Sequence, residues 1–127
     1  MEKWLFYLLQ EGINNAADKD LLQLINKFSI ENIDSFEHLS KTRKNYDLIY
    51  IDPMFSGVGK SKAKRAIQAL RNLTQEAETE GLLDLAIKRS SKRVIVKRHK
   101  NSKFLEDIKP SHSIKGKVVR YDIYNSS

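Results

Sequence analysis

The feature that most constrains the fold is an apolar run that stops abruptly at an acid and a proline. Residues Tyr46–Ile51 read YDLIYI, and Asp52-Pro53 follows directly. A run of this kind has strong β propensity and is typical of a strand buried on both faces, as in sheets that helices cover on each side. We therefore expect a strand over 46–51 inside an α/β domain.

The rest of the chain alternates between helical and strand patterns, which favours a mostly parallel α/β sheet. Apolar spacing predicts helices over 3–11 (broken by Gly12 and the Asn14-Asn15 pair), after an Asp18 N-cap, after a Ser35 cap, around 63–70 and over 75–89. Strand propensity predicts strands over Phe28–Ile33, 93–97 and 117–124, with a polar connection over 99–116. At 127 residues, one domain over 1–127 is expected.

Charge divides the chain into two unequal halves. Residues 1–59 hold six Lys and Arg against nine Asp and Glu, whereas residues 60–127 hold 17 against seven, within a net charge of +7. Excess charge concentrated in one half favours a polyanionic partner. We prefer nucleic acid to a membrane surface, because no basic amphipathic helix carries large apolar anchors. For any one basic cluster, an ordinary solvated face is an equally good interpretation.

Composition excludes several other classes. With no cysteine, the chain has no disulfide framework, cysteine zinc site or thiol nucleophile. Its three histidines lack metal-ligand spacing, so no metal site is predicted. The longest uncharged apolar run, Trp4 to Leu9, is far too short to cross a bilayer. Without a secretory signal pattern, a cytoplasmic location is expected.

The residues after the clearest strand are the best candidates for chemistry, because ligands of open α/β sheets bind beyond the carboxyl ends of the strands. Asp52 offers a carboxylate acceptor, Pro53 fixes the backbone, and Phe55 offers a flat face on which a base can stack. Together they suit the exocyclic amine of a flipped nucleobase. The alternative is that Asp-Pro opens an ordinary turn and Phe55 belongs to the core.

Two other motifs are weaker. Gly57-Val58-Gly59-Lys60-Ser61 resembles a phosphate loop, but that motif needs a glycine where this chain has Met54. A loop that becomes ordered on a nucleic acid phosphate fits these residues better. In Glu31-Asn32-Ile33-Asp34, a polar side chain could bind a cofactor's amino group, or Asp34 or Ser35 could simply cap the next helix.

Three blocks of the second half resemble the RsmJ family. They are Tyr46–Phe55 (YDLIYIDPMF), Ser91–Arg98 (SKRVIVKR), and a final block with His112-Ser113, Gly116-Lys117 and Arg120–Tyr124 (RYDIY). That family comprises bacterial methyltransferases that modify the guanine N2 amine of small-subunit ribosomal RNA (rRNA), with S-adenosylmethionine (SAM) as the methyl donor. The resemblance therefore implies SAM as cofactor and rRNA or the small ribosomal subunit as partner.

The resemblance also implies a fold and a set of site residues. The fold is a Rossmann-like class I methyltransferase sheet, with strand order 3-2-1-4-5-7-6. Asp52, Pro53 and Phe55 would receive the target guanine, with Asp52 also at the SAM site. Near the adenosine contact fall Asn32, Ile33 and Asp34. The candidates for RNA phosphate contact or support of the site are Lys60, Lys97, Arg98, Lys117 and Arg120.

Family features expected upstream are absent from this sequence. No G-x-G precedes a helix in the first 45 residues, so the sheet is expected to be incomplete and to lack its first two strands. Three interpretations follow. The chain is a C-terminal part that is impaired alone, or a complementing N-terminal polypeptide or a homodimer covers the open edge, or the chain is a non-catalytic RNA-binding remnant domain.

Overall fold

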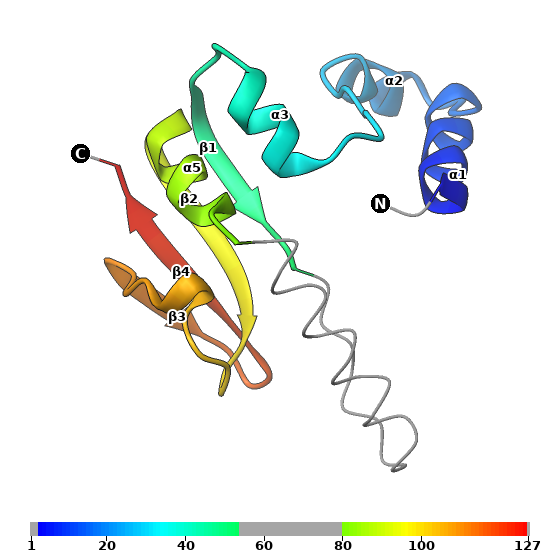
Figure 1. Cartoon of the computed structure of the whole chain (residues 1–127). Coiled ribbons are helices and arrows are strands. Elements are labelled where there is room, and N and C mark those ends of the chain that lie inside the picture. Colours follow the sequence, from blue (N-terminus) through cyan, green and yellow to red (C-terminus); the bar gives the residue numbers. More distant parts are fainter. Residues whose placement is uncertain (1–2, 54–79, 127) are drawn as a thin grey trace. The chain divides into compact units, whose positions relative to one another are not determined.

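The computed structural model describes residues 3–53 and 80–126. The chain divides into two compact units, Met1–His38 and Leu39–Ser127, with the boundary inside helix α3 (Ser35–Lys41) (Figure 1). A single domain over 1–127 therefore stays a prediction. None of the described helices has the length and apolar character needed to cross a membrane.

The first unit contains helices α1 (Lys3–Asn14) and α2 (Lys19–Ile25), neither of which buries a residue. The expected N-cap is confirmed, because the Asp18 carboxylate accepts a 3.0 Å hydrogen bond from the backbone N–H of Leu21. Of the two expected breaks, the one at Gly12 is wrong, since the helix continues to Asn14, and the one at Asn14-Asn15 is confirmed. A glycine inside an exposed helix lowers helix stability by only about 1 kcal/mol relative to alanine. The backbone hydrogen bonds after it are kept, as from the N–H of Asn15 to the carbonyl of Glu11 at 3.0 Å.

The strand expected over Phe28–Ile33 is also wrong. Within the described ranges, this segment has no strand partner and runs as irregular backbone into α3. A strand needs a neighbour for its N–H and C=O groups, so propensity alone cannot form one.

The second unit is built on a four-stranded sheet with the order β1-β2-β4-β3 (Figure 1). The strands are β1 (Tyr46–Ile51), β2 (Ser90–His99), β3 (His112–Lys115) and β4 (Val119–Asn125). β1 and β2 are parallel, whereas β4 is antiparallel to both β2 and β3. The described sheet is therefore mixed rather than mostly parallel. Its order agrees with the 4-5-7-6 run of the class I methyltransferase sheet.

The connection expected over 99–116 is more structured than predicted. It contains the short 3-10 helix η1 (Leu105–Asp107) and the whole of β3. The β3 sequence HSIK holds only one large apolar residue, so its pairing with β4 has no strong local signal.

Helix α5 (Leu82–Arg89) lies within the range expected for a helix and buries Leu82, Leu83 and Ala86. These side chains share one core with the sheet and η1, which contribute Ile51, Val94, Val96, Leu105 and Tyr124. The alternation of a strand places these sheet residues on a single face.

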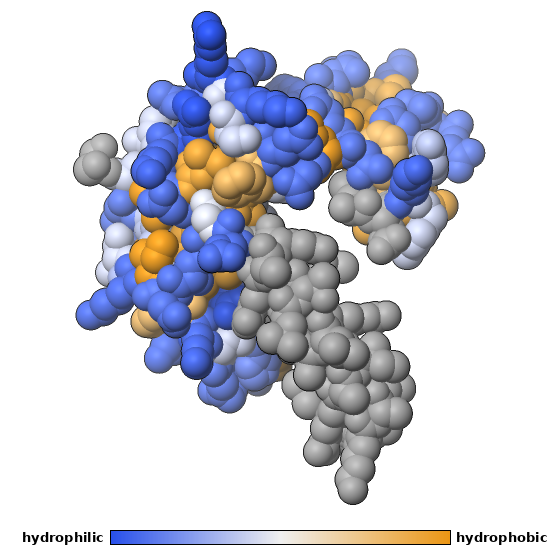
Figure 2. Space-filling model, viewed as in Figure 1, coloured by the Kyte–Doolittle hydropathy of each residue, from blue (hydrophilic) through white to orange (hydrophobic). Residues whose placement is uncertain are grey.

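The other face of β1 is open. Leu48 and Tyr50 are each 51% exposed, whereas Ile51 is buried. The expectation that β1 is buried on both faces is therefore wrong, since apolar content cannot say what covers a strand. Apolar residues lie among hydrophilic ones on the surface of both units (Figure 2).

Candidate functional site

Asp52 and Pro53 lie directly after the last residue of β1, at the carboxyl end of the sheet. Parallel pairing places Ile51 opposite Val96, so Lys97 of β2 is the next residue at this end. The turn after β2 and the turn between β3 and β4 are found at the same end, because β4 runs in the opposite direction. Three separate segments therefore meet where open α/β sheets bind ligands.

Asp52 forms an ion pair with Lys97, with 3.4 Å between Nζ and a carboxylate oxygen. The two side chains are 37% and 31% exposed, so each is half-buried and still reachable from solvent. Pairs of this kind contribute at most about 1 kcal/mol to stability. The main consequence is orientation, because Lys97 fixes one oxygen of Asp52 and leaves its other lone pairs for a ligand.

Tyr50 lies on the same face of β1 as Asp52, two residues earlier. Partial burial raises the pKa of its hydroxyl above the ordinary value, and the negative charge of Asp52 raises it further. The hydroxyl therefore stays protonated at neutral pH and can donate a hydrogen bond. Sequence reasoning missed Tyr50, although its spacing of two from Asp52 on a strand was a usable signal.

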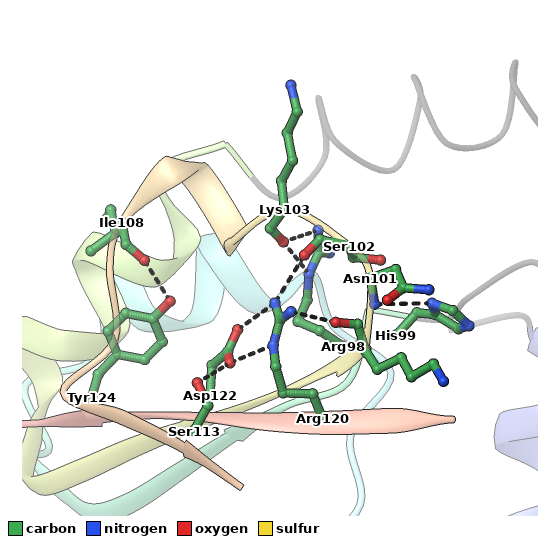
Figure 3. A network of polar contacts seen from close by, with 11 residues as sticks. Arg98, His99, Asn101, Ser102, Lys103, Ile108, Ser113, Arg120, Asp122 and Tyr124 are labelled. Carbon is green, nitrogen blue, oxygen red and sulfur yellow. Dashed lines mark hydrogen bonds and ion pairs between the residues drawn. The ribbon is translucent and has the colours of Figure 1, made fainter. Parts of the chain in front are cut away.

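Arg120 and Asp122 form a buried ion pair at the centre of a polar network (Figure 3). Asp122 is fully buried and accepts two bonds from Arg120, at 2.7 and 3.0 Å, and one from Ser113 at 2.6 Å. The guanidinium of Arg120 also lies 5.1 Å from the ring centroid of Phe104. Burial and the neighbouring charge of Asp122 raise the pKa of Tyr124 to about 12, and its hydroxyl donates to the carbonyl of Ile108.

The same network holds the turn after β2. Arg120 donates to the carbonyls of Lys100 and Ser102, at 2.9 and 3.0 Å. Arg98 donates twice to the carbonyl of Lys103, at 3.1 and 2.9 Å. Of the two roles predicted for these arginines, phosphate contact or support of the site, the observed contacts are those of support. Sequence reasoning missed Ser113 and Asp122, although Arg120-Tyr121-Asp122 is the spacing of a same-face pair.

The residues expected near adenosine belong to the first unit. The Asp34 carboxylate accepts a 2.8 Å hydrogen bond from the backbone N–H of Glu37, so Asp34 caps α3 and Ser35 is its first residue. Asn32, Ile33 and Asp34 are all exposed. One capping bond uses only part of the acceptor capacity of a carboxylate, so a cofactor's amino group could still bind Asp34.

Lys117 is exposed in the turn before β4. The other predicted site residues, Phe55 and Lys60, and the whole motif Gly57–Ser61 lie outside the described residues. In the segments 3–53 and 80–126, no three His, Asp or Glu side chains gather as metal ligands would.

Comparison with known proteins gives consistent results. The family model described as "Putative SAM-dependent methyltransferase" matches residues 3–126. A "Ribosomal RNA small subunit methyltransferase J" from Francisella tularensis subsp. holarctica is 36% identical over 129 residues, which cover 98% of this chain and 54% of that protein. The protein of the same name from Francisella philomiragia is 34% identical, over 96% of this chain and 53% of its own length.

A solved structure shares the fold. The SAM-dependent methyltransferase NGO1261 from Neisseria gonorrhoeae superposes with a TM-score of 0.72 at 24% sequence identity, over 95% of this chain and 48% of that protein. The chain thus spans about half the length of the relatives that it matches.

Proposed function

This chain belongs to the family of SAM-dependent methyltransferases, and from that premise we propose that it forms the target-base side of an enzyme that methylates small-subunit rRNA. The methyl group goes to the exocyclic N2 of a guanine. The observation that carries the proposal is the carboxylate of Asp52 at the carboxyl end of β1, oriented by Lys97 at 3.4 Å. The names of the Francisella relatives supply the substrate class.

The chemistry needs orientation more than activation by a base. The lone pair of the guanine N2 amine is delocalised into the ring, which makes the amine a poor nucleophile. Asp52 accepts a hydrogen bond from one amine proton, and the backbone at Pro53 adds a fixed acceptor. Phe55 stacks on the base. Holding the amine in line with the methyl group lowers the barrier through positioning and electrostatics. Asp52 remains an acceptor, and the released proton leaves to water.

When bound, SAM would supply a methyl group on a positively charged sulfur, and the sulfur would keep the electron pair of the broken carbon–sulfur bond and leave as neutral S-adenosylhomocysteine. The Asp52 carboxylate suits the edge of such a site because an anion at the carboxyl end of the sheet attracts that positive charge. Asn32, Ile33 and Asp34 are our candidates for contacts to adenosine. These candidates do not include residues that would hold the methionine and ribose parts of SAM.

Catalysis therefore depends on residues beyond this chain's 127. The matched relatives are about twice as long, and β1 pairs with a single neighbour among the described strands. A strand from the rest of the enzyme, from a complementing polypeptide or from a second copy would satisfy that edge. An enzyme that methylates bacterial ribosomal RNA would act in the cytoplasm, where ribosomes are located.

The test joins this chain to the N-terminal segment of the F. tularensis relative that the alignment does not cover. We expect the fusion protein to transfer radiolabelled methyl groups from SAM to unmodified small-subunit rRNA. Asp52→Ala, which removes the acceptor, should slow transfer by about 100-fold, the usual effect of removing one oriented polar group. The control is Asp47→Ala on the same strand, an exposed acid that pairs with Lys92 at the other end, and its rate should match the parent. Equal rates for both variants would contradict the role of Asp52.

A second candidate function is RNA binding without catalysis. The observation that favours it is the concentration of positive charge in residues 60–127. In that case the chain binds RNA with an affinity that falls steeply with salt. The fusion protein would then bind no SAM in isothermal titration calorimetry, which separates this function from the enzyme.

A further inference from the structure

We propose that four lysines at the carboxyl end of the sheet form the surface on which the phosphate backbone of a single RNA strand docks. The inference rests on the proposed function and adds to it the place where the substrate is held. The four residues, called the turn lysines below, are Lys100, Lys103, Lys115 and Lys117. All four are exposed.

Backbone contacts bring the turn lysines together from two separate turns. The N–H of Lys100, after β2, donates to the carbonyl of Val118 at 3.0 Å. Gly116 N–H donates to the carbonyl of Val119 at 2.8 Å and closes the turn between β3 and β4. The two turns therefore lie side by side at the carboxyl end of the sheet. Asp52 lies at the same end, so RNA bound to these turns would run past the proposed target-base site.

The first of these turns is held in one shape. Arg98 and Arg120 bind the carbonyls of Lys100, Ser102 and Lys103. These oxygens, which would repel phosphate, are thus directed at the buried guanidinium of Arg120 and at the half-buried guanidinium of Arg98. Figure 3 shows the side chain of Lys103 extending away from the network. A surface fixed before binding loses less entropy when its ligand arrives.

The turn lysines also differ in pairing from the lysines at the opposite end of the sheet. Lys88 pairs with Asp84 at 2.7 Å, and Lys92 pairs with Asp47 at 3.7 Å. No acid within 3–53 or 80–126 pairs with any of the turn lysines. Unpaired ammonium groups gathered on one edge bind a polyanion by releasing its counterions.

The test compares two variants of the full chain with equal net charge. One replaces the turn lysines with glutamine. The matched control replaces four exposed cations at the amino end of the sheet, Lys44, Lys88, Lys92 and Arg93, with glutamine. The measurement is the affinity for a short fluorescein-labelled single-stranded RNA across a series of salt concentrations, by fluorescence anisotropy. Circular dichroism melting confirms that both variants fold.

We expect the turn-lysine variant to bind more weakly and its salt dependence to flatten. The slope of log affinity against log salt should lose about 0.7 for each phosphate contact removed. The control should keep most of the parent slope. Equal losses in the two variants would show that net charge alone attracts RNA and would overturn the proposal. An absence of RNA binding by the parent chain would overturn it as well. Neither result touches the proposed function, which is judged by SAM binding and methyl transfer in the fusion protein.

Discussion

At the scale of single residues, the most consequential contact is the buried pair of Arg120 and Asp122. Arg120 is 6% exposed and Asp122 is fully buried. Burying two charges lowers stability, and here that cost is offset in part because Ser113 donates to Asp122 and two backbone carbonyls accept from Arg120. The pair is therefore sensitive to the loss of either member.

We predict that Asp122→Ala lowers the free energy of unfolding by about 3–5 kcal/mol, because it leaves the guanidinium of Arg120 buried without a counter-charge. Urea denaturation followed by circular dichroism measures the change. The control is Asp47→Ala, whose ion pair with Lys92 is largely exposed and whose loss should cost less than about 1 kcal/mol. Similar values for the two variants would show that the buried network adds no special stability.

Sequence patterns predicted Asp52 and Pro53 at the end of a strand, because a strong local run stops there. They did not predict the partners of Asp52. Lys97 is 45 positions away, and only the parallel register of β1 and β2 brings the two side chains together. Arg98 and Arg120 were candidates for phosphate contact or support of the site, and the carbonyls that they bind belong to a turn whose shape no local pattern specifies.

At the scale of elements, the start of α5 depends on a residue from η1. Its N-cap is Gly81, which has a positive φ of 81° and no side chain to accept the first N–H groups. Glu106 supplies the missing acceptor, with bonds from the N–H groups of Gly81 at 2.9 Å and Leu83 at 2.6 Å. A carboxylate in this place also complements the positive end of the helix dipole.

We predict that Glu106→Ala destabilises the second unit by about 1–2 kcal/mol, the usual effect of losing an N-cap side chain. Asp107→Ala is a close control, because Asp107 has nearly the same positive φ, 55° against 53° for Glu106. Both variants therefore place alanine in the same strained backbone, and the difference in urea midpoint isolates the cap. Equal midpoints would mean that Glu106 stabilises nothing beyond its own turn.

Long or strongly biased elements were predictable, and short or partner-dependent ones were not. α5 and the strands β1, β2 and β4 have clear local patterns. β3 has one large apolar residue in four positions and forms because β4 offers an edge. Phe28–Ile33 is the opposite case, since it has strand propensity but no partner strand among the described residues. The residue that caps α5 is more than 20 positions away from the helix start in the sequence, so no local sequence pattern predicts it.

At the scale of the whole molecule, the charge division was visible in the sequence, and the class I strand order was implied by the family resemblance. The sequence did not show which segments cover the sheet, because the residues of a strand do not specify what packs beside it. β1 is one of the two edge strands of the described sheet, and Leu48 and Tyr50 on its open face are each 51% exposed. An uncovered edge that carries apolar side chains favours pairing with another strand.

We therefore predict that the N-terminal segment of the F. tularensis relative pairs with β1 when it is added to this chain. Hydrogen–deuterium exchange followed by mass spectrometry should show slower exchange in peptides that cover Tyr46–Ile51, because backbone N–H groups of the open edge gain partners. Exchange in α5 is the internal control and should not change, since its N–H groups already have helical or cap partners. If β1 is already protected in the chain alone, and more so at higher chain concentration, a second copy occupies the edge. If β1 exchanges at the same rate under every condition, the edge has no strand partner, and complementation by a separate segment is wrong.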